Sequence, residues 1–199
     1  TPVVASYSDT RALSAMAVEA GKTVEVLIAV ETGMGRIGFM PCKKSVNEII
    51  GISNLPNIKI KGIFSHFSTA DEKDKSFTYR QIEVFDRFYR DLEAAGITIN
   101  FRTHANSAAT IEVPESWFDA VRPGIILYGC YPSNEVDKSL IDLKPAMTLK
   151  AAIVFLKRVP PGTPISYGRK FVTKRESIIA TIPIGYADGY PRLLSGKGR

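Results

Sequence analysis

The sequence predicts an α/β protein in which parallel strand–helix units come first and a smaller region of antiparallel β-structure follows. Over roughly the first 130 residues, short apolar runs alternate with helical patterns about every 25–35 residues, as in parallel βα units. Later apolar runs are joined by Pro-Gly and charged turns, with no helical pattern between them. The polar stretch between the two regions predicts one domain over residues 1–135 and another over residues 140–199.

The apolar runs of the first region are predicted to be buried strands. They are apolar at nearly every position, as strands are when both faces of a parallel sheet are covered. Five such strands are expected, at residues 3–7, 23–30, 58–66, 99–104 and 118–124. Five parallel strands fit either a doubly wound sheet or part of a (β/α)8 barrel, and a complete barrel needs about 250 residues.

Helical periodicity fills the gaps between these strands. The helix after the first strand is expected to begin at Ser8 or Asp9 and to end before Gly21, with Met16 on its buried face. Further helices are expected at residues 42–50, at 75–95 and from about 107 onward. In the second region, antiparallel strands are expected at residues 146–159, 163–168 and 177–185.

The composition argues against several classes of partner. Twenty-six Lys and Arg residues against 20 Asp and Glu give a net charge of +6. The basic residues are dispersed along the chain, and no nucleic-acid motif accompanies them. We therefore expect an anionic small ligand and no nucleic acid. No apolar run approaches the roughly 18 residues that a membrane span needs, so no membrane partner is expected.

The two cysteines bear on the cellular compartment of the protein, and the first residues bear on its length. Cys42 and Cys130 lie far apart without metal-ligand spacing, which predicts reduced packing residues of a cytoplasmic protein and no metal site. The chain opens at "TPVVASYS" without an initiator methionine, which favours a piece of a longer protein.

Polar residues follow four of the five predicted strands. In parallel βα architectures, ligands bind beyond the carboxyl ends of the strands. The loops concerned are "ETGMGRIGF" (31–39), "SHFSTADEKD" (65–74), "THANSAAT" (103–110) and "VRPGI" (121–125). They bring to one mouth Arg36, His66, Asn106, Ser107 and Arg122.

These loops suit one kind of ligand. Ser107 at a helix start and the backbone N–H groups of Gly124 and Ile125 form a concave set of donors for a phosphate. Two arginines and a histidine at the same mouth suit a flat, anionic, nitrogen-containing ring. Together they indicate pyridoxal 5'-phosphate.

Each feature also fits a purely structural role. Asn106 and Ser107 are typical helix caps, and the glycines of residues 33–38 are typical of a tight turn. His66 fits a structural histidine at a strand end, and the same role is expected for His104.

The loops resemble those of the alanine racemase family, the fold-type III pyridoxal-phosphate enzymes. The matching motifs stand in family order: "TGMGRIGF", "SHFSTADE", "ANSAAT", "VRPGIILYG" and "GYADGYPR". The resemblance implies a partial (β/α)8 TIM barrel, about its last five βα strands, followed by the start of a mostly β C-terminal domain. It also implies a homodimer.

The resemblance implies roles for the loop residues. The implied cofactor-binding residues are Arg36, His66, Asn106, Ser107, Arg122, Gly124 and Ile125. Arg36 would also contact the substrate carboxylate, and Arg122 would face the pyridine nitrogen. Because arginine keeps its proton, that nitrogen would stay unprotonated, and the ring would favour proton exchange over transamination.

Tyr186, in "GYADGYPR" (185–192), is the implied catalytic base. Inverting a stereocentre requires one base on each face, and the family uses the cofactor lysine on one face and this tyrosine, from the partner subunit, on the other. His66 and Arg122 of the other chain are expected to act as cations that help the phenol lose its proton. The structural alternative is a tyrosine that packs at the end of a strand.

Two departures from the family pattern stand out. No lysine of this chain has the context of the cofactor lysine, so the chain alone is expected to be inactive. Ala29 stands where many family members carry a lysine whose carbamylation holds the arginine, so water, an anion or another residue must orient Arg36.

The leading hypothesis is therefore a cytoplasmic alanine racemase that interconverts L- and D-alanine by two-base proton transfer and supplies D-alanine for the bacterial cell wall. The first alternative is a serine or broad-specificity racemase of the same family. The second is a non-catalytic barrel protein that binds pyridoxal phosphate.

Overall fold

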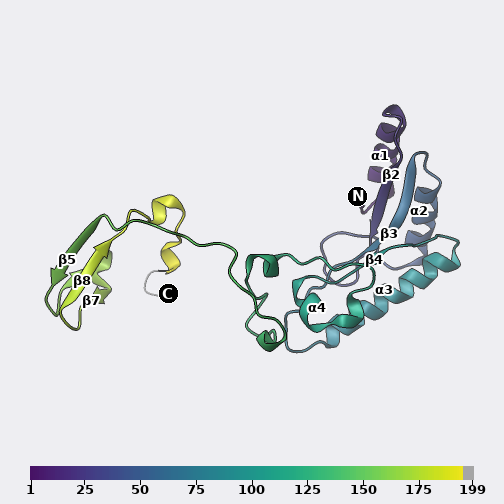
Figure 1. Ribbon diagram of the computed structural model, residues 1–199. Helices are drawn as coiled ribbons and strands as arrows, with labels where there is room; N and C mark the ends of the chain where they lie inside the picture. The colour runs from purple at the N-terminus through teal and green to yellow at the C-terminus, as the bar shows by residue number, and fades with distance from the viewer. Residues whose placement is uncertain (195–199) are drawn as a thin grey trace. The chain divides into compact units, whose positions relative to one another are not determined.

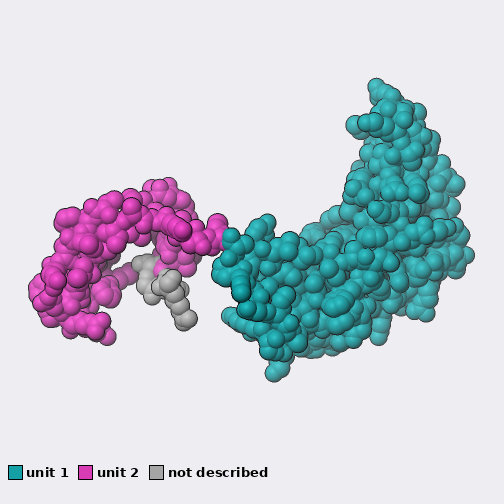
Figure 2. Space-filling model, viewed as in Figure 1, with its two compact units in different colours: residues 1–146 teal, residues 147–199 magenta. Residues whose placement is uncertain are grey.

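The computed structural model describes residues 1–194, which belong to two compact units, residues 1–146 and 147–199 (Figure 2). Each unit is described separately below. No helix within the described range is long and apolar enough to cross a membrane.

The first unit is built on a parallel sheet whose strands alternate with helices (Figure 1). The strands are β1 (Val3–Val4), β2 (Val24–Ala29), β3 (Ile58–Phe64) and β4 (Arg102–Thr103). The helices are α1 (Tyr7–Glu19), α2 (Lys43–Ser53), α3 (Ser76–Ala94) and α4 (Ser107–Glu112). Three 3-10 helices complete it: η1 (Pro114–Ser116), η2 (Ile125–Tyr128) and η3 (Lys138–Leu140).

The strand order decides between the two architectures that the sequence left open. The order is β1-β2-β3-β4, and each strand pairs in parallel with the strand before it in the chain. A doubly wound sheet reverses its order at a switch point, whereas a barrel adds strands in sequence. The unit therefore has the strand order of a barrel segment.

The strands at the end of the barrel segment are shorter than expected. The strand predicted at 99–104 is only Arg102–Thr103, and the one predicted at 118–124 is a single parallel bridge between Thr103 and Ala120. Phe118 has a φ of 45°, which breaks the extended backbone just before that bridge. The first strand is short as well, because Tyr7 already belongs to α1.

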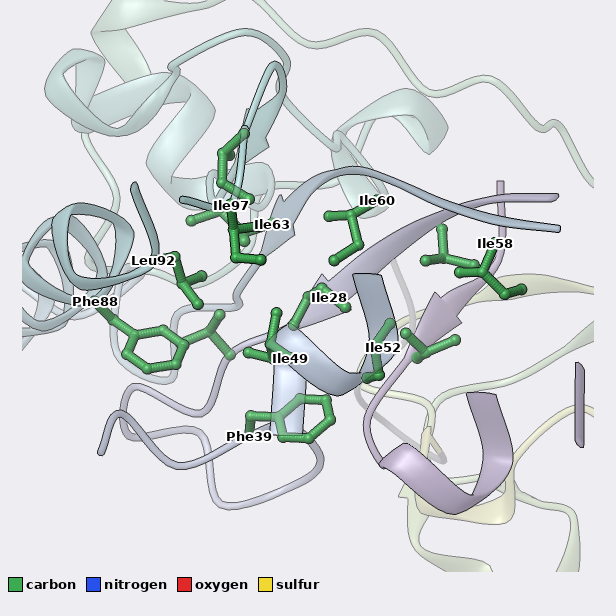
Figure 3. Packing of buried hydrophobic residues seen from close by; sticks show 14 of the residues in the cluster. Ile28, Phe39, Ile49, Ile52, Ile58, Ile60, Ile63, Phe88, Leu92 and Ile97 are labelled. Carbon is green, nitrogen blue, oxygen red and sulfur yellow. The ribbon is translucent and has the colours of Figure 1, made fainter. Parts of the chain in front are cut away.

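The core of the first unit lies between the sheet and the helices, as the apolar patterns predict (Figure 3). Ile28 of β2 and Ile63 of β3 are fully buried, and they belong to one cluster with Ile49 of α2. Helix α3 adds Phe85, Phe88 and Leu92, spaced at three and four residues.

Helix α1 differs from its prediction at both its start and its buried face. It begins at Tyr7, and Ser6 is its N-cap, since Ser6 Oγ accepts a hydrogen bond from Asp9 N at 3.1 Å. Met16 is 67% exposed, so the prediction that it is buried is wrong. The helix buries Ala17 and packs Leu13 against the core, and the buried Ser14 donates to the Pro56 carbonyl at 2.6 Å.

The cysteines also differ from their prediction. Both Cys42 and Cys130 are free thiols, but both are exposed and neither packs in the core. Cys42 lies at the N-cap of α2, a position at the surface of the unit.

The second unit is antiparallel, as predicted. Strand β5 (Phe155–Val159) pairs with β8 (Ser177–Thr181), and β6 (Pro164–Ile165) pairs with β7 (Phe171–Val172). The described 3-10 helices are η4 (Tyr167–Arg169), η5 (Tyr186–Asp188) and η6 (Arg192–Leu194). The predicted strand over 146–159 thus forms only in its last five residues, and the one over 177–185 ends at Thr181.

Candidate active site

The predicted site residues of the first unit lie in the segments that follow β2, β3 and β4 and in the segment that follows Ala120. Arg36 lies between β2 and α2, and His66 lies two residues beyond β3. Asn106 and Ser107 begin α4. Because the strands are parallel, these segments share one edge of the sheet.

Arg122 is the most firmly held of these residues. Its guanidinium donates to Thr103 Oγ1 at 2.6 Å, to the Ser65 carbonyl at 2.5 Å and to the His104 carbonyl at 3.1 Å. It also lies over the Phe64 ring, 4.3 Å from the centroid. Burial, and then the charge of Arg36, lower the pKa of Arg122 to about 10, so it remains charged at neutral pH.

His66 contacts this guanidinium through its ring. Its Nδ1 lies 3.3 Å from an Arg122 terminal nitrogen, and because a guanidinium only donates, the neutral ring accepts at Nδ1. Burial, followed by the charges of Arg122 and Arg36, lowers the pKa of His66 to about 4. His66 is therefore neutral at pH 7, and the expectation that it acts as a cation near Tyr186 is wrong.

The expected phosphate-binding residues lie together, with one difference from the prediction. The Gly124 N–H is not free, because it donates to Ser107 Oγ at 2.8 Å. Within residues 1–194, neither the Ser107 hydroxyl hydrogen nor the Ile125 N–H has an acceptor. The Ser107 hydroxyl and the Ile125 N–H are thus both available to donate, and the hydrogen bond from Gly124 to Ser107 connects their segments. Such a set of donors suits an anion such as a phosphate.

Asn106 has the capping role that the sequence also allowed. Its Oδ1 accepts from Ala109 N at 3.1 Å, and its Nδ2 donates to the Phe67 carbonyl at 3.4 Å. The cap thus ties the start of α4 to the loop that follows His66.

The loop of residues 31–39, which carries Arg36, is organised by Glu31. The Glu31 carboxylate accepts from Gly33 N at 2.5 Å and from Arg36 N at 3.1 Å. Burial opposes ionisation of Glu31, but bonds from the backbone of the loop outweigh it and leave its pKa below the ordinary value. Gly38 has a φ of 133°, and a Cβ there would lie 2.7 Å from Glu31 N, so this glycine is required by the turn.

Glu31, and not residue 29, thus fixes the backbone of Arg36 in this chain. Ala29 is fully buried in β2 and offers no polar group, whereas Glu31 fixes the backbone of Arg36. The Arg36 side chain is exposed, and no partner for its guanidinium lies in the described part of the chain.

Tyr186 belongs to the second unit, in η5. The turn is closed by a hydrogen bond from Gly185 N to Asp188 Oδ2 at 2.9 Å and by Gly189, whose φ is 90°. The Tyr186 side chain is 65% exposed and lines an open pocket of about 730 Å³, with the Arg192 guanidinium 5.7 Å from its ring centroid. The turn thus presents the phenol outward, and packing at the end of a strand does not account for it.

Three residues of the site were not predicted from the sequence: Thr103, Glu31 and Gln81, whose side chain donates to the His66 carbonyl. Thr103 stands in the "THANSAAT" loop, and its position at a strand end was the only available signal.

No group of three or more metal-ligating side chains gathers anywhere in residues 1–194.

Two family descriptions match the chain. Residues 1–132 match "Alanine racemase, N-terminal domain", and residues 146–199 match "Alanine racemase, C-terminal domain". The chain belongs to the alanine racemase family. The resemblance of the five motifs is therefore confirmed.

Individual alanine racemases agree with this assignment. The chain is 56% identical over 196 residues to "Alanine racemase 1" of Clostridium acetobutylicum, covering 98% of this chain and 51% of the relative. It is 55% identical to "Alanine racemase" of Clostridium novyi, with the same coverage. The solved alanine racemase of Clostridium difficile 630 has a TM-score of 0.86 at 43% identity, covering 96% of this chain and 50% of that one. The chain thus spans about half the length of the relatives it matches.

Proposed function

We propose that residues 1–199 form part of a pyridoxal-phosphate-dependent alanine racemase that interconverts L- and D-alanine. The observation that carries this proposal is the charged, immobilised guanidinium of Arg122 beside the neutral ring of His66, at the edge where Ser107 and Ile125 hold unsatisfied donors. The high identity to proteins named alanine racemase supports it.

The donor set fits pyridoxal 5'-phosphate. Ser107, Gly124 and Ile125 would hold the phosphate, and Asn106 and His66 would line the pocket. When bound, the cofactor withdraws electrons from the substrate α-carbon, which makes its proton removable.

Arg122 would face the pyridine nitrogen of the cofactor. Its pKa of about 10 keeps it protonated at neutral pH, and a guanidinium has no acceptor atom. It can therefore only donate, which suits a ring nitrogen that carries no proton. This favours proton exchange at the α-carbon, the reaction that a racemase needs.

Arg36 would bind the cofactor phenolate and the substrate carboxylate. Its backbone is fixed by Glu31, while its guanidinium is exposed with no partner in residues 1–194. Because its backbone is fixed and its guanidinium is free to donate, Arg36 is suited to bind a carboxylate.

Tyr186 would move the proton on the face opposite the cofactor lysine, acting in the site of the partner subunit of a homodimer. Its support is the capped turn that exposes the phenol. Since His66 is neutral, Arg122 would be the one of these two expected cations that faces Tyr186 across that interface. The enzyme would act in the cytoplasm and supply D-alanine for the cell wall.

The test uses the full-length form, meaning a chain of the relatives' length that includes residues 1–199. Incubation with L-alanine in D2O should give D-alanine and deuterium at the α-carbon. Tyr186→Phe should lower turnover by about 10²–10⁴-fold while the cofactor absorbance persists, because one positioned base is lost. The matched control is Tyr79→Phe, at an exposed position on α3, which should leave turnover unchanged.

The outcomes separate the alternatives. Faster turnover of L-serine than of L-alanine would indicate a serine or broad-specificity racemase. Binding of pyridoxal phosphate without D-alanine or deuterium exchange would indicate a non-catalytic barrel protein. Full turnover by Tyr186→Phe would refute the role of Tyr186.

A further inference from the structure

Gln81 is a fully buried polar residue on the face of α3 that also buries Phe85, Phe88 and Leu92. Its Nε2 donates to Thr32 Oγ1 and to the His66 carbonyl, both at 3.1 Å. Its Oε1 accepts from Ser68 N at 3.1 Å and lies 3.2 Å from Ser68 Oγ. Both donors of the amide and both lone pairs of its oxygen are thus used.

These bonds join the two loops that carry Arg36 and His66. Thr32 lies in the loop after β2, and His66 and Ser68 lie in the loop after β3. Thr32 Oγ1 also lies 2.8 Å from Ser65 Oγ, which donates to the Val30 carbonyl at 2.8 Å. The amide therefore belongs to a network that reaches Val30 and Ser65, the residues just after β2 and β3.

Burying the Gln81 amide has a free-energy cost that an apolar side chain would avoid. A buried amide without partners is strongly unfavourable, and a leucine or methionine would pack on the same helix face without needing any. A fully paired network, in contrast, specifies a single arrangement of the groups it bonds. The position of Gln81 thus indicates that it serves the arrangement of the loops.

We propose that Gln81 is a positioning residue that holds the His66 and Arg36 loops in register at the cofactor edge. By fixing the His66 carbonyl, it keeps the ring Nδ1 of His66 at 3.3 Å from the Arg122 guanidinium. Its effect on cofactor binding rests on the proposed function, whereas its effect on His66 does not.

The first test follows the titration of His66 by NMR in the cofactor-free full-length form labelled with [13C]histidine, the signal being assigned by its loss in His66→Gln. The charged groups that face His66 are Arg122 and Arg36, and the His104 ring beside them is neutral. In Gln81→Met the released loop should let the ring become hydrated and leave Arg122, so the pKa of His66 should rise from about 4 toward 6.5.

The matched control is Thr78→Val. Thr78 is also buried on α3, but its hydroxyl lies 3.3 Å from Thr69 Oγ1, farther along the loop after β3. Within the described residues it bonds neither His66 nor the loop after β2. The pKa of His66 should be the same in this variant as in the wild type. A Gln81→Met protein whose His66 titrates like the wild type would overturn the inference.

Gln81→Asn gives a second, more selective variant if Gln81→Met does not fold. It keeps a neutral amide but is one methylene shorter, so it cannot keep all of the bonds to Thr32, His66 and Ser68, and the pKa of His66 should again rise without any new charge. The dissociation constant of pyridoxal phosphate should rise about tenfold, the order expected when one buried polar group loses its partner.

The two proposals fail in different ways. A wild-type full-length form that does not bind pyridoxal phosphate would refute the proposed function, and the NMR comparison would still decide the role of Gln81. A wild type that binds the cofactor, with a Gln81→Asn protein that binds it equally well and shows an unshifted His66, would refute the role of Gln81 alone.

Discussion

At the scale of single residues, His104 shows how a buried histidine can serve as an aromatic ring. Its side chain is fully buried, and neither ring nitrogen has a hydrogen-bond partner in the described structure. The ring stacks on Phe67 at a centroid distance of 3.7 Å and lies 4.8 Å from the Phe85 ring. Burial, then Arg122 and His66, lower the pKa of His104 well below the ordinary value, so the ring stays neutral.

The lowered pKa of His104 predicts a loss of stability in acid. His104 of the unfolded chain binds a proton near pH 6.5, whereas His104 of the folded chain does not. The free energy of unfolding is therefore highest above pH 6.5 and decreases as the pH falls below that value. His104→Phe removes this group and keeps the stack. Between pH 7.5 and 5.5, the wild type should lose about 1 kcal/mol more than His104→Phe. Urea unfolding of the cofactor-free full-length form at the two pH values measures this.

Phe85→Leu is the control for that comparison. It disturbs the same stack without removing a titrating group, so it should lower the free energy of unfolding by a similar amount at both pH values. If His104→Phe lost as much stability in acid as the wild type, the neutral buried state of His104 would be wrong.

At the scale of elements, β3 depends on a glycine in its middle. A Cβ on Gly62 would lie 1.8 Å from the Phe101 carbonyl oxygen, beside the bond that Ile63 N makes to that oxygen at 2.9 Å. On its other side, the pairing with β2 shifts register here, because Val26 pairs with Ile60 and the next residue pairs with Gly62. A strand glycine often marks such a bulge and a close approach of two backbones.

Gly62→Ala should therefore be severely destabilising. The clash is with backbone, so no rotamer relieves it, and β3 and the segment before β4 must separate. We expect a loss of about 3 kcal/mol or more in the free energy of unfolding, or failure to fold. Circular dichroism during urea unfolding of the full-length form measures the loss.

Gly51→Ala is the matched control for the strand glycine. The heavy atoms nearest to a new Cβ belong to the Tyr7 side chain, at 3.0 Å or more, and alanine favours the helix by about 1 kcal/mol. A Gly62→Ala protein as stable as Gly51→Ala would contradict the close approach of β3 and Phe101.

Some helices and loops could be predicted from the sequence, whereas several residues of the site could not. Periodicity and strand-end polarity located helices α2 and α3 and the loops of the site, because these signals are local. Gln81 was missed because a polar residue on an apolar face carries no sign of its partners, which come from two other loops. The neutrality of His66 was missed because it results first from burial in the folded unit and then from the charges of two arginines that are distant in sequence. The short strand near Ala120 was overestimated because an apolar run does not reveal how much of it is paired.

At the scale of the whole molecule, the second unit differs from the first in how little it buries. Within residues 147–194, only Val159 and Thr173 are buried. Large apolar side chains of the β5–β8 ladder are more than half exposed, among them Phe155 at 59% and Ile178 at 59%. A two-stranded ladder is marginally stable without a covering layer. The unit therefore presents apolar surface that other chain segments would cover.

The last prediction follows from this exposure. Expressed alone, residues 1–199 should associate, because exposed apolar side chains and unpaired strand edges promote contacts between chains. Light scattering at increasing concentration should give an apparent mass above the 21.9 kDa of one chain. Replacing Phe155 and Ile178 by lysine should lower that mass, whereas Lys22→Ser, an exposed position in the first unit, should leave it unchanged. A wild-type chain that stays monomeric over the whole range would show that its apolar surface needs no cover.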